Sequence, residues 1–440
     1  MAILHVINIA TMHVPLANSL QAGNQRTSTS ATSNSGDFQS WSIDNNFADF
    51  APFEETTTGS IWIHFRAGSR DVAARFKSTN NADIAAVLID GSDGLFKVYQ
   101  GASLVSTITP TAGAVGSNDP HDWDIQITGN TVRIYRDGVI DGEDTAGWMG
   151  TSHPVNTLHG FAARALNGNR MTEIIVSDSD TRGMRLLTVD AESDGALTGF
   201  SGSYADISGD QLDPITFASA TGASSQTYDY ENIPTSAKAA GLVPEAVIIG
   251  TVASATSSST APFLANIVND SGSPKECATP IGQGPDSHAG SLTTIMHTNP
   301  LTGQVWTNTD FDNMQFGVQA LESDFEITVG KSASNEYGMA TTVIFGSTTK
   351  AMTGETINRF FSKSGSPSEF NISFTGGSNG LISTGESKIL VSVLVNGKGY
   401  EFTLEYDGST RYEGVVPDGC RDDFVAAENT TVKAIIRPIS

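Results

Sequence analysis

The feature of this sequence that most constrains its fold is a series of short segments in which apolar and polar residues alternate. In residues 122–140, DWDIQITGNTVRIYRDGVI, two such segments flank a Gly-Asn pair, and an Asp-Gly pair follows the second. Alternation with a period of two places successive side chains on opposite faces of a strand, and such dipeptides favour tight turns. The stretch therefore predicts antiparallel strands joined by hairpins.

The alternation also assigns the faces of the first of these strands. Trp123 and Ile125 share one face, and we expect them to point into a hydrophobic core because large aromatic side chains supply much of the burial energy. His121 is expected at the polar end of the same face. Asp122 and Asp124 point the other way, and the pattern predicts that they are solvated.

Similar runs recur along the first part of the chain. In residues 60–67, SIWIHFRA, Ile63 and Phe65 share one face while Trp62 and His64 share the other. Strands at this spacing, separated by turn residues, predict a β-sandwich. The eight runs cover residues 60–67, 85–90, 95–100, 102–108, 122–127, 131–136, 160–165 and 172–178.

The rest of the chain repeats this organisation, and no window of eleven or more residues has a helical period, so the fold class is all-β. A hairpin is predicted around Asn396 and Gly397, and residues 233–245 are predicted to form a loop or a single helical turn. Turn-rich stretches divide the chain into an amino-terminal attachment segment and linker, a first sandwich, a second β-sandwich and a small carboxy-terminal β domain. Their ranges are 1–37, 38–188, 189–349 and 350–440.

Charge and composition exclude several classes of partner. The chain has 24 Lys and Arg against 48 Asp and Glu, a net charge of -24, which disfavours nucleic acid and anionic membrane surfaces. The sequence contains no run of 18 apolar residues, so it predicts no membrane-spanning segment. The amino terminus lacks the basic residues of a signal peptide, and Cys277 and Cys420 form no disulfide framework or metal-finger spacing.

Two resemblances narrow the class of protein. Residues 38–180, with Trp123 heading one strand and TVRIYRDG in the next, resemble the laminin-G/concanavalin-A-like jelly-roll family, which includes glycan-binding modules, adhesion modules and some glycanases. Residues 172–207 and 297–321 are similar, in the same order, to segments of tailed-bacteriophage virion proteins. Phe200 stands where that family often has Trp.

The second resemblance implies a structural protein of the virion exterior, on the tail, neck or capsid, made in the host cytoplasm. Its partners would be other virion proteins, further copies of itself in a homo-oligomer, and a glycan of the host surface. The alternative is a free lectin-like adhesin that binds polysaccharide. An envelope glycanase is a third and weaker hypothesis, because it rests on fold resemblance alone.

The sequence predicts no enzyme and no catalytic residue. Glycanases on this fold need two carboxylates on one strand, spaced so that one acts as nucleophile while the other donates a proton. No such spacing occurs. Glu54 and Glu55 are adjacent, so on a strand they would point to opposite faces and could not act on one sugar.

Three acidic, Gly-containing loops have a composition suited to calcium, at residues 90–94, 141–147 and 177–183. Asp and Gly also occur together in turns that hold no ion, because Asp side chains cap their own turns. No cofactor or metal is therefore predicted. In the third loop, Arg182 is expected to pair with Asp178 or Asp180 and to brace the junction between domains.

Surface aromatic residues on loops are a common means of holding a sugar ring. Trp148 lies in the loop-like stretch DTAGWMGTSHPV, close to His153. These two residues are the candidate glycan contacts of the sequence, with packing in the core as the alternative for Trp148.

Overall fold

A computed structural model covers the 440-residue chain. The residues that it describes are 3–7, 28–29, 39–40, 48–49, 60–67, 72–78, 83–90, 92–100, 103–116, 121–128, 131–145, 158–165, 171–187, 189–207, 217–253, 255, 261–270, 272–283, 290–323, 325–331, 336–345, 360–362, 374–375, 387–406, 411–414, 420, 423 and 431–438.

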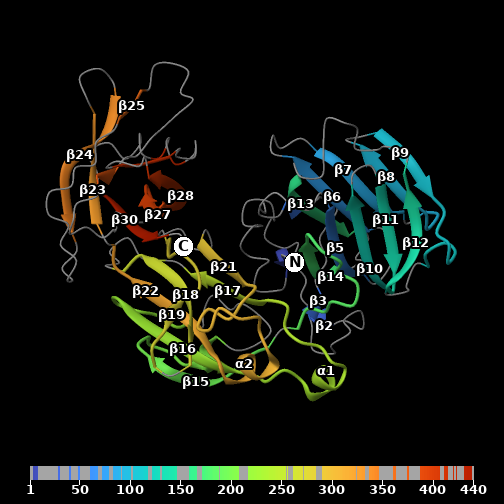
Figure 1. Ribbon diagram of the computed structural model, residues 1–440, viewed down its shortest axis with the longest axis horizontal. Helices are drawn as coiled ribbons and strands as arrows, with labels where there is room; N and C mark the ends of the chain where they lie inside the picture. Colours follow the sequence, from blue (N-terminus) through green and yellow to red (C-terminus); the bar gives the residue numbers. More distant parts are fainter. Residues whose placement is uncertain are drawn as a thin grey trace.

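The first part of the chain forms two antiparallel sheets of six strands each, seen on the right of Figure 1. Sheet I contains, in order, β1 (Ile3–Ile7), β14 (Met171–Ser177), β5 (Ser60–Ala67), β10 (His121–Thr128), β11 (Thr131–Arg136) and β12 (Val139–Asp144). Sheet II contains β4 (Ala48–Asp49), β13 (Leu158–Ala165), β6 (Val72–Ser78), β7 (Asp83–Ile89), β8 (Phe96–Gln100) and β9 (Ser103–Ile108).

The strand order identifies the sandwich as a jelly roll. In sheet I, β5 pairs with β14, and in sheet II, β6 pairs with β13. The consecutive strands β5 and β6 therefore run beside the consecutive strands β13 and β14 through both sheets. An antiparallel ribbon that crosses from one sheet to the other in this way is the jelly-roll winding. The predicted all-β fold class, with a jelly-roll sandwich first, is confirmed.

The core of the jelly roll lies between the two sheets and follows the predicted alternation. In sheet I, Trp123 lies opposite Phe65, and both side chains are fully buried. Across the sandwich, the ring of Phe96 meets that of Trp123 edge to face, with 5.6 Å between ring centroids. Aromatic pairs favour this geometry. Gly142 lies against this contact, where a Cβ atom would come within 3.0 Å of the Phe96 ring.

The next part of the chain, which we call the middle body, has two layers. One is a sheet of β15 (Ala191–Thr198), β16 (Ser224–Tyr230), β22 (Gln315–Leu321), β18 (Phe263–Asn269) and β19 (Lys275–Glu276), with β20 (Ile281–Gly282) also paired to β18. The other is the pair β17 (Val247–Ala253) and β21 (Gly290–Met296). Buried Val268 and Phe316 of the first layer pack with Val247 and Met296 of the second and with Trp306.

The helices of the middle body are short. They are η3 (Tyr204–Asp206), α1 (Thr235–Ala239) and α2 (Asn308–Asn313). The single turn α1 confirms the prediction for residues 233–245. Helix α2 begins with a capping box, in which the Thr307 hydroxyl accepts a bond from the Asp310 backbone N–H and the Asp310 carboxylate bonds back to Thr307. No helix in the described ranges is long and apolar enough to span a membrane.

The last part of the chain forms an eight-stranded sheet. Its strands are, in order, β25 (Phe360–Ser362), β24 (Glu336–Phe345), β23 (Phe325–Lys331), β30 (Thr431–Pro438), β27 (Lys388–Val395), β28 (Lys398–Tyr406), β29 (Arg411–Glu413) and β26 (Phe374–Thr375). The predicted hairpin at Asn396 and Gly397 is confirmed, and both residues have positive φ, as a tight hairpin turn requires.

Two strand assignments differ from the predicted division of the chain. The sequence places residues 1–37 in an attachment segment and linker, but β1 is an edge strand of sheet I, antiparallel to β14, and β2 (Ser28–Thr29) pairs with β3 (Gln39–Ser40). The sequence places β23 and β24 in the second β-sandwich, but β23 pairs with β30 of the carboxy-terminal sheet. The pairings of β1 with β14 and of β23 with β30 are long-range, and local patterns do not encode them.

Candidate functional site

The outer face of sheet I carries polar and aromatic side chains in two rows that cross the strands. The register of β12, β11, β10, β5 and β14 aligns one residue from each strand in every row. Because side chains alternate between faces, the residues of both rows point away from the core. The first row is Glu143, Arg133, Gln126, Trp62 and Ser177, and the second is Ile140, Tyr135, Asp124, His64 and Ile175.

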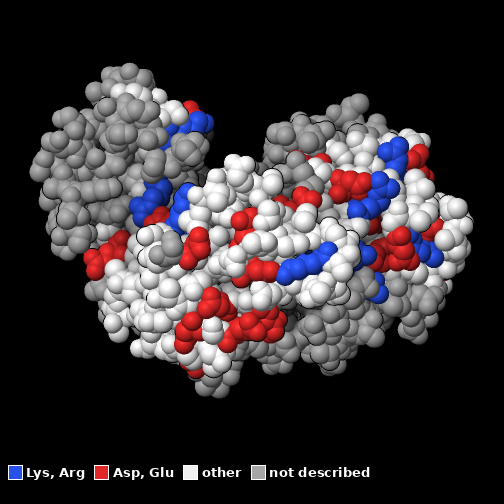
Figure 2. All heavy atoms as spheres, turned by 60° about the horizontal axis from the view of Figure 1, so that its bottom comes forward, with Lys and Arg blue, Asp and Glu red and all other residues white. Residues whose placement is uncertain are grey.

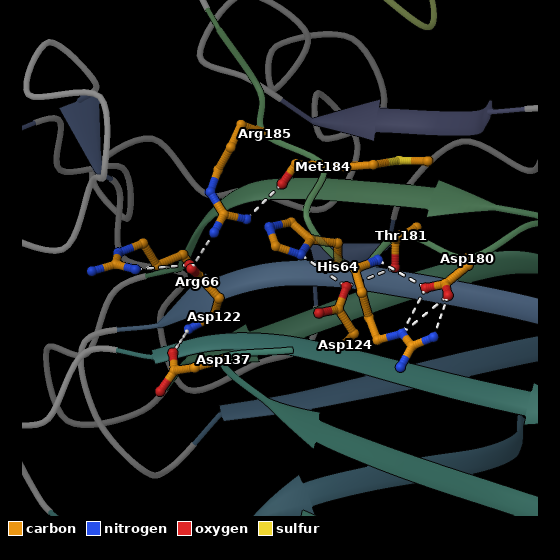
Figure 3. Close-up of polar contacts among 10 residues, drawn as sticks. His64, Arg66, Asp122, Asp124, Asp137, Asp180, Thr181, Met184 and Arg185 are labelled. Atoms are coloured by element: carbon orange, nitrogen blue, oxygen red, sulfur yellow. Dashed lines mark hydrogen bonds and ion pairs between the residues drawn. The ribbon is translucent and has the colours of Figure 1, made fainter. Parts of the chain in front are cut away.

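Part of this face is covered by the segment that follows β14, residues 178–187, which we call the crossing segment. Figure 3 shows it lying over the strands, with Thr181 directed at Asp124 and Arg185 directed at Asp122. The same segment contributes Leu186 to a small apolar cluster with Ile175 of sheet I. The face is thereby divided into a covered half, near His64, and an open half, near Arg133.

Asp124 is the centre of the covered half. Its Oδ1 lies 3.0 Å from His64 Nδ1 and accepts a hydrogen bond of 2.7 Å from the Thr181 hydroxyl. Asp124 is 1% exposed, and His64 and Thr181 are fully buried. A buried carboxylate must be hydrogen-bonded, because removing a charge from water without a partner is costly. Its two partners come from β5 and from the crossing segment, so Asp124 fastens that segment to the sheet.

Asp122 makes a second fastening. Its two oxygens accept hydrogen bonds from Arg66 and Arg185, each at 2.7 Å, and its side chain is 10% exposed. Burial alone would raise the pKa of Asp122, but the hydrogen bond from Arg66 and the positive charges of Arg185 and Arg66 outweigh it, so the pKa is lowered. The carboxylate is therefore ionised and paired at neutral pH.

The prediction that Asp122 and Asp124 are solvated strand residues is wrong. Their direction, away from the core, follows the alternation, but both are buried. The reason is tertiary, since the crossing segment returns over the outer face and supplies Thr181 and Arg185 as partners. A pattern within one strand does not show what lies above it.

The open half is built on a pair of aromatic rings. Trp62 and Tyr135 stack with ring centroids 5.5 Å apart and planes 26° apart. The guanidinium carbon of Arg182 lies 4.7 Å from the Tyr135 centroid and 5.6 Å from that of Trp62. Such contacts between a cation and aromatic rings stabilise by about 0.5–2 kcal/mol. Both rings are buried and form a rigid base, and the partly exposed Arg182 side chain lies over them at the surface.

Two arginine–carboxylate pairs line the surface of the open half. Arg133 Nε lies 2.5 Å from Glu143 Oε2, and Arg182 makes a bidentate contact with Asp180, in which Nε and Nη2 lie 2.9 Å and 2.5 Å from the two oxygens. The four side chains are between 34% and 45% exposed. The hydrogen bonds from Arg182 lower the pKa of Asp180. The predicted pairing of Arg182 is thus confirmed, with Asp180 as its partner.

We call the open half the polar platform and define it as Trp62, Gln126, Arg133, Tyr135, Glu143, Asp180 and Arg182. Gln126 lies between the first pair and the rings, because its side-chain oxygen accepts a bond of 3.3 Å from Arg133 and it lies opposite Trp62 in the register. The platform presents donors and acceptors side by side at fixed positions above aromatic rings. That arrangement suits hydroxyl groups, which both donate and accept hydrogen bonds.

The structure describes only some of the residues that the sequence singles out. Trp148 and His153 lie outside the described residues, as do Glu54 and Glu55. His121 lies at the end of β10 on the core side, as expected, with Nδ1 2.7 Å from the Asp137 carboxylate and its ring 5.5 Å from that of Trp123.

The acidic loops are held by basic partners where the structure describes them. Lys97 bonds the Asp90 carboxylate at 2.7 Å and lowers its pKa to about 2. Arg136 pairs with the buried Asp141 at 2.6 Å. Within the described ranges, no three His, Cys, Asp or Glu side chains are grouped so that they could hold a metal ion.

Sequence reasoning found part of the platform and missed the rest. The alternation in residues 60–67 placed Trp62 and His64 on one face, which the register confirms. The same rule applied to residues 131–136 would have placed Arg133 and Tyr135 on the outer face together. The position of Arg182 over the rings of Trp62 and Tyr135 could not be predicted from any local pattern, because it depends on the path of the crossing segment.

Comparison with known proteins gives a distant likeness of fold. No family model matches the chain, and no curated protein matches it in sequence. A galectin of Caenorhabditis elegans has 9% identity, covers 36% of this chain and 99% of its own, and has a TM-score of 0.22. A carbohydrate-binding module of Bacillus subtilis has 12% identity, 34% and 90% coverage and a TM-score of 0.22. An alginate lyase from Corynebacterium sp. has 12% identity, 36% and 83% coverage and the same TM-score.

Proposed function

We propose that the jelly roll is a non-catalytic, lectin-like module that binds a glycan on the polar platform. The observation that carries this proposal is the pair of partly exposed arginine–carboxylate contacts, Arg133 with Glu143 and Arg182 with Asp180, fixed over the stacked rings of Trp62 and Tyr135. A rigid surface loses little side-chain entropy when a ligand orders it, which favours binding by a small contact area.

The two buried carboxylates of the covered half favour a binding role over a catalytic one. Asp122 and Asp124 lie two residues apart on one face of β10, the separation at which two carboxylates could meet one substrate. Each is buried under the crossing segment and held by structural partners, Asp122 by two arginines and Asp124 by His64 and Thr181. Their hydrogen bonds stabilise the fold, and the glycan surface lies beside them.

A glycan array tests this proposal on the full-length chain. The wild type is expected to bind one or more polysaccharides, and the double variant Arg133→Ala/Glu143→Ala is expected to lose that binding. Removing both partners leaves no unpaired charge behind. The matched control is Lys388→Ala/Glu405→Ala, which removes a cross-strand pair of the same kind from the carboxy-terminal sheet. Equal binding by all three proteins would refute the platform, and an empty array for the wild type would refute the lectin-like role.

A second proposal concerns where the protein acts, and it rests on a separate observation. The observation is the pair of segments that resemble tailed-bacteriophage virion proteins, residues 172–207 and 297–321. The first contains the crossing segment and β15, and the second contains buried Trp306, α2 and the whole of β22. We infer an exterior virion protein that presents the jelly roll to a glycan of the host surface, with other virion proteins and further copies of itself as partners.

Mass spectrometry of purified particles tests the virion proposal separately from glycan binding. The chain is expected among the structural proteins of intact virions at a copy number that fits a symmetric appendage. Its absence from intact particles, together with its presence in the soluble lysate, would leave the free adhesin as the remaining role.

A further inference from the structure

The charges of the polar platform cancel in pairs, although the chain as a whole has a net charge of -24. Arg133 is matched by Glu143, and Arg182 is matched by Asp180. In the covered half beside it, Arg66 and Arg185 both pair with Asp122, while Asp124 contacts His64, so the outer face carries four arginines and four carboxylates. Figure 2 shows basic and acidic side chains intermixed on the jelly roll, whereas over part of the middle body acidic side chains gather alone.

The arginines of the platform are already engaged by carboxylates. Arg182 uses Nε and Nη2 on the two oxygens of Asp180, and Arg133 uses Nε on Glu143 and Nη1 on Gln126. An arginine fork recognises an anionic sugar by a bidentate contact with its carboxylate. These donor groups are already occupied here, and the negative charges of Glu143 and Asp180 would repel an incoming carboxylate. The remaining N–H groups can donate a hydrogen bond to a neutral hydroxyl, and the remaining carboxylate lone pairs can accept one from it.

The first row is longer than one sugar ring. Its accessible part runs from Glu143 on β12 through Arg133 to Gln126 on β10, which is two inter-strand spacings or about 10 Å, and Trp62 at its β5 end is buried. Ile140, 46% exposed, lies beside its β12 end and offers an apolar surface to a sugar ring. The row therefore matches a short stretch of polysaccharide that crosses the strands.

We infer that the ligand of the platform is a neutral polysaccharide, bound through neighbouring hydroxyl groups by a stretch of several sugar units, and that acidic polysaccharides are excluded. This inference rests on the proposed glycan-binding function and specifies its ligand. Each arginine–carboxylate pair supplies one donor and one acceptor at adjacent positions, which is the complement of two adjacent sugar hydroxyls.

Titration calorimetry on the full-length protein distinguishes the classes of ligand. The neutral probes are cellohexaose, maltohexaose and mannohexaose, each with its monosaccharide, and the acidic probes are oligogalacturonate and oligomannuronate. We expect at least one neutral hexasaccharide to bind, more tightly than its monosaccharide, with an affinity that changes less than about twofold between 20 mM and 500 mM NaCl because no net charge is neutralised. We expect no binding of the acidic probes.

The substitution Glu143→Gln gives a second, opposite readout. It frees the Arg133 guanidinium while keeping a polar side chain of the same size, so affinity for the neutral ligand should fall and weak, salt-sensitive binding of an acidic oligosaccharide should appear. The control is Glu405→Gln, which frees Lys388 in the carboxy-terminal sheet and should change neither property. Circular dichroism and the melting temperature confirm that the variants are folded.

The possible outcomes distinguish a failure of this inference from a failure of the proposed glycan-binding function. Salt-sensitive binding of acidic oligosaccharides by the wild type, weakened by Arg133→Ala, would overturn the neutral ligand class while leaving a glycan site on the platform. Neutral binding that Glu143→Gln does not affect would place the ligand elsewhere and overturn the inference. Failure of every probe, neutral and acidic, would contradict the glycan-binding function itself.

Discussion

At the scale of single residues, the most constrained group of the outer face is the buried carboxylate of Asp124. It has no access to water, so its stability depends on His64 and Thr181. A local sequence pattern gave its direction on the strand but not its burial. Hydrogen bonds to a charged group are among the stronger ones in proteins, and leaving such a group partly unsatisfied costs the most.

Removing the Thr181 hydroxyl tests this role. Thr181→Val keeps the shape of the side chain but deletes the donor to Asp124, and we expect a loss of about 1–3 kcal/mol in the free energy of unfolding. The measurement is urea denaturation followed by tryptophan fluorescence. Thr107→Val on the exposed side of β9 is the control and should change stability by less than about 0.5 kcal/mol. Equal effects of the two substitutions would show that Thr181 does not fasten the crossing segment.

The lowered pKa of Asp122 makes the stability of the protein depend on pH. Its pKa is lower in the folded protein than the value of about 3.9 for an unfolded chain, so its contribution is complete above about pH 4 and is lost as the pH falls through the folded pKa. We expect Asp122→Asn to be less stable than the wild type at pH 7 and the difference to shrink on acidification toward pH 2. Melting temperatures measured across this range check the trend. A difference that stays constant with pH would contradict the ionic role of Asp122.

At the scale of elements, period-two alternation predicted strands where side chains alternate between core and surface, and missed those where they do not. Strands β5, β10 and β11 were found because one face packs in the sandwich core. The polar strand β15 lacks such alternation, since its residues are largely exposed and resemble a turn. Its pairing with β16 depends on long-range backbone hydrogen bonds, which composition does not reveal.

A close approach of two strands in the middle body gives a prediction at this scale. Gly317 on β22 lies so near β16 that a Cβ atom would come within 1.9 Å of the Gln226 carbonyl oxygen. We expect Gly317→Ala to destabilise the protein by about 2–3 kcal/mol, because one strand must shift. Gln319→Ala, two residues further along β22, is the control. Thermal unfolding of both variants measures the loss of stability. Equal melting temperatures for Gly317→Ala and the wild type would mean that the two strands separate easily.

At the scale of the whole molecule, the crossing segment joins the jelly roll to the middle body. Its residues Thr181, Arg182 and Arg185 bind the outer face of sheet I, while Met184 and Leu186 pack with Ile175 of sheet I and with Ile248 and Ile295 of the middle body. The two bodies are thus connected by packing as well as by the chain. The sequence predicts that Arg182 braces the junction, but it does not predict the packing of Met184 and Leu186.

Replacing Leu186 tests the connection between the bodies. Leu186→Ser places a hydroxyl in the apolar junction, so we expect the jelly roll and the middle body to move more independently and the radius of gyration from small-angle scattering to increase. The neighbouring Leu187 is 38% exposed, so Leu187→Ser is a matched control that should leave the radius unchanged. An identical radius for wild type and Leu186→Ser would show that other contacts hold the bodies together.

The central claim, a glycan site on the open half of sheet I, is tested most directly by hydrogen–deuterium exchange of the full-length protein with and without its neutral oligosaccharide. We expect slower exchange on binding in β10, β11, β12 and residues 178–183, and no change in the carboxy-terminal sheet. Slower exchange confined to the middle body or to the carboxy-terminal sheet would contradict it.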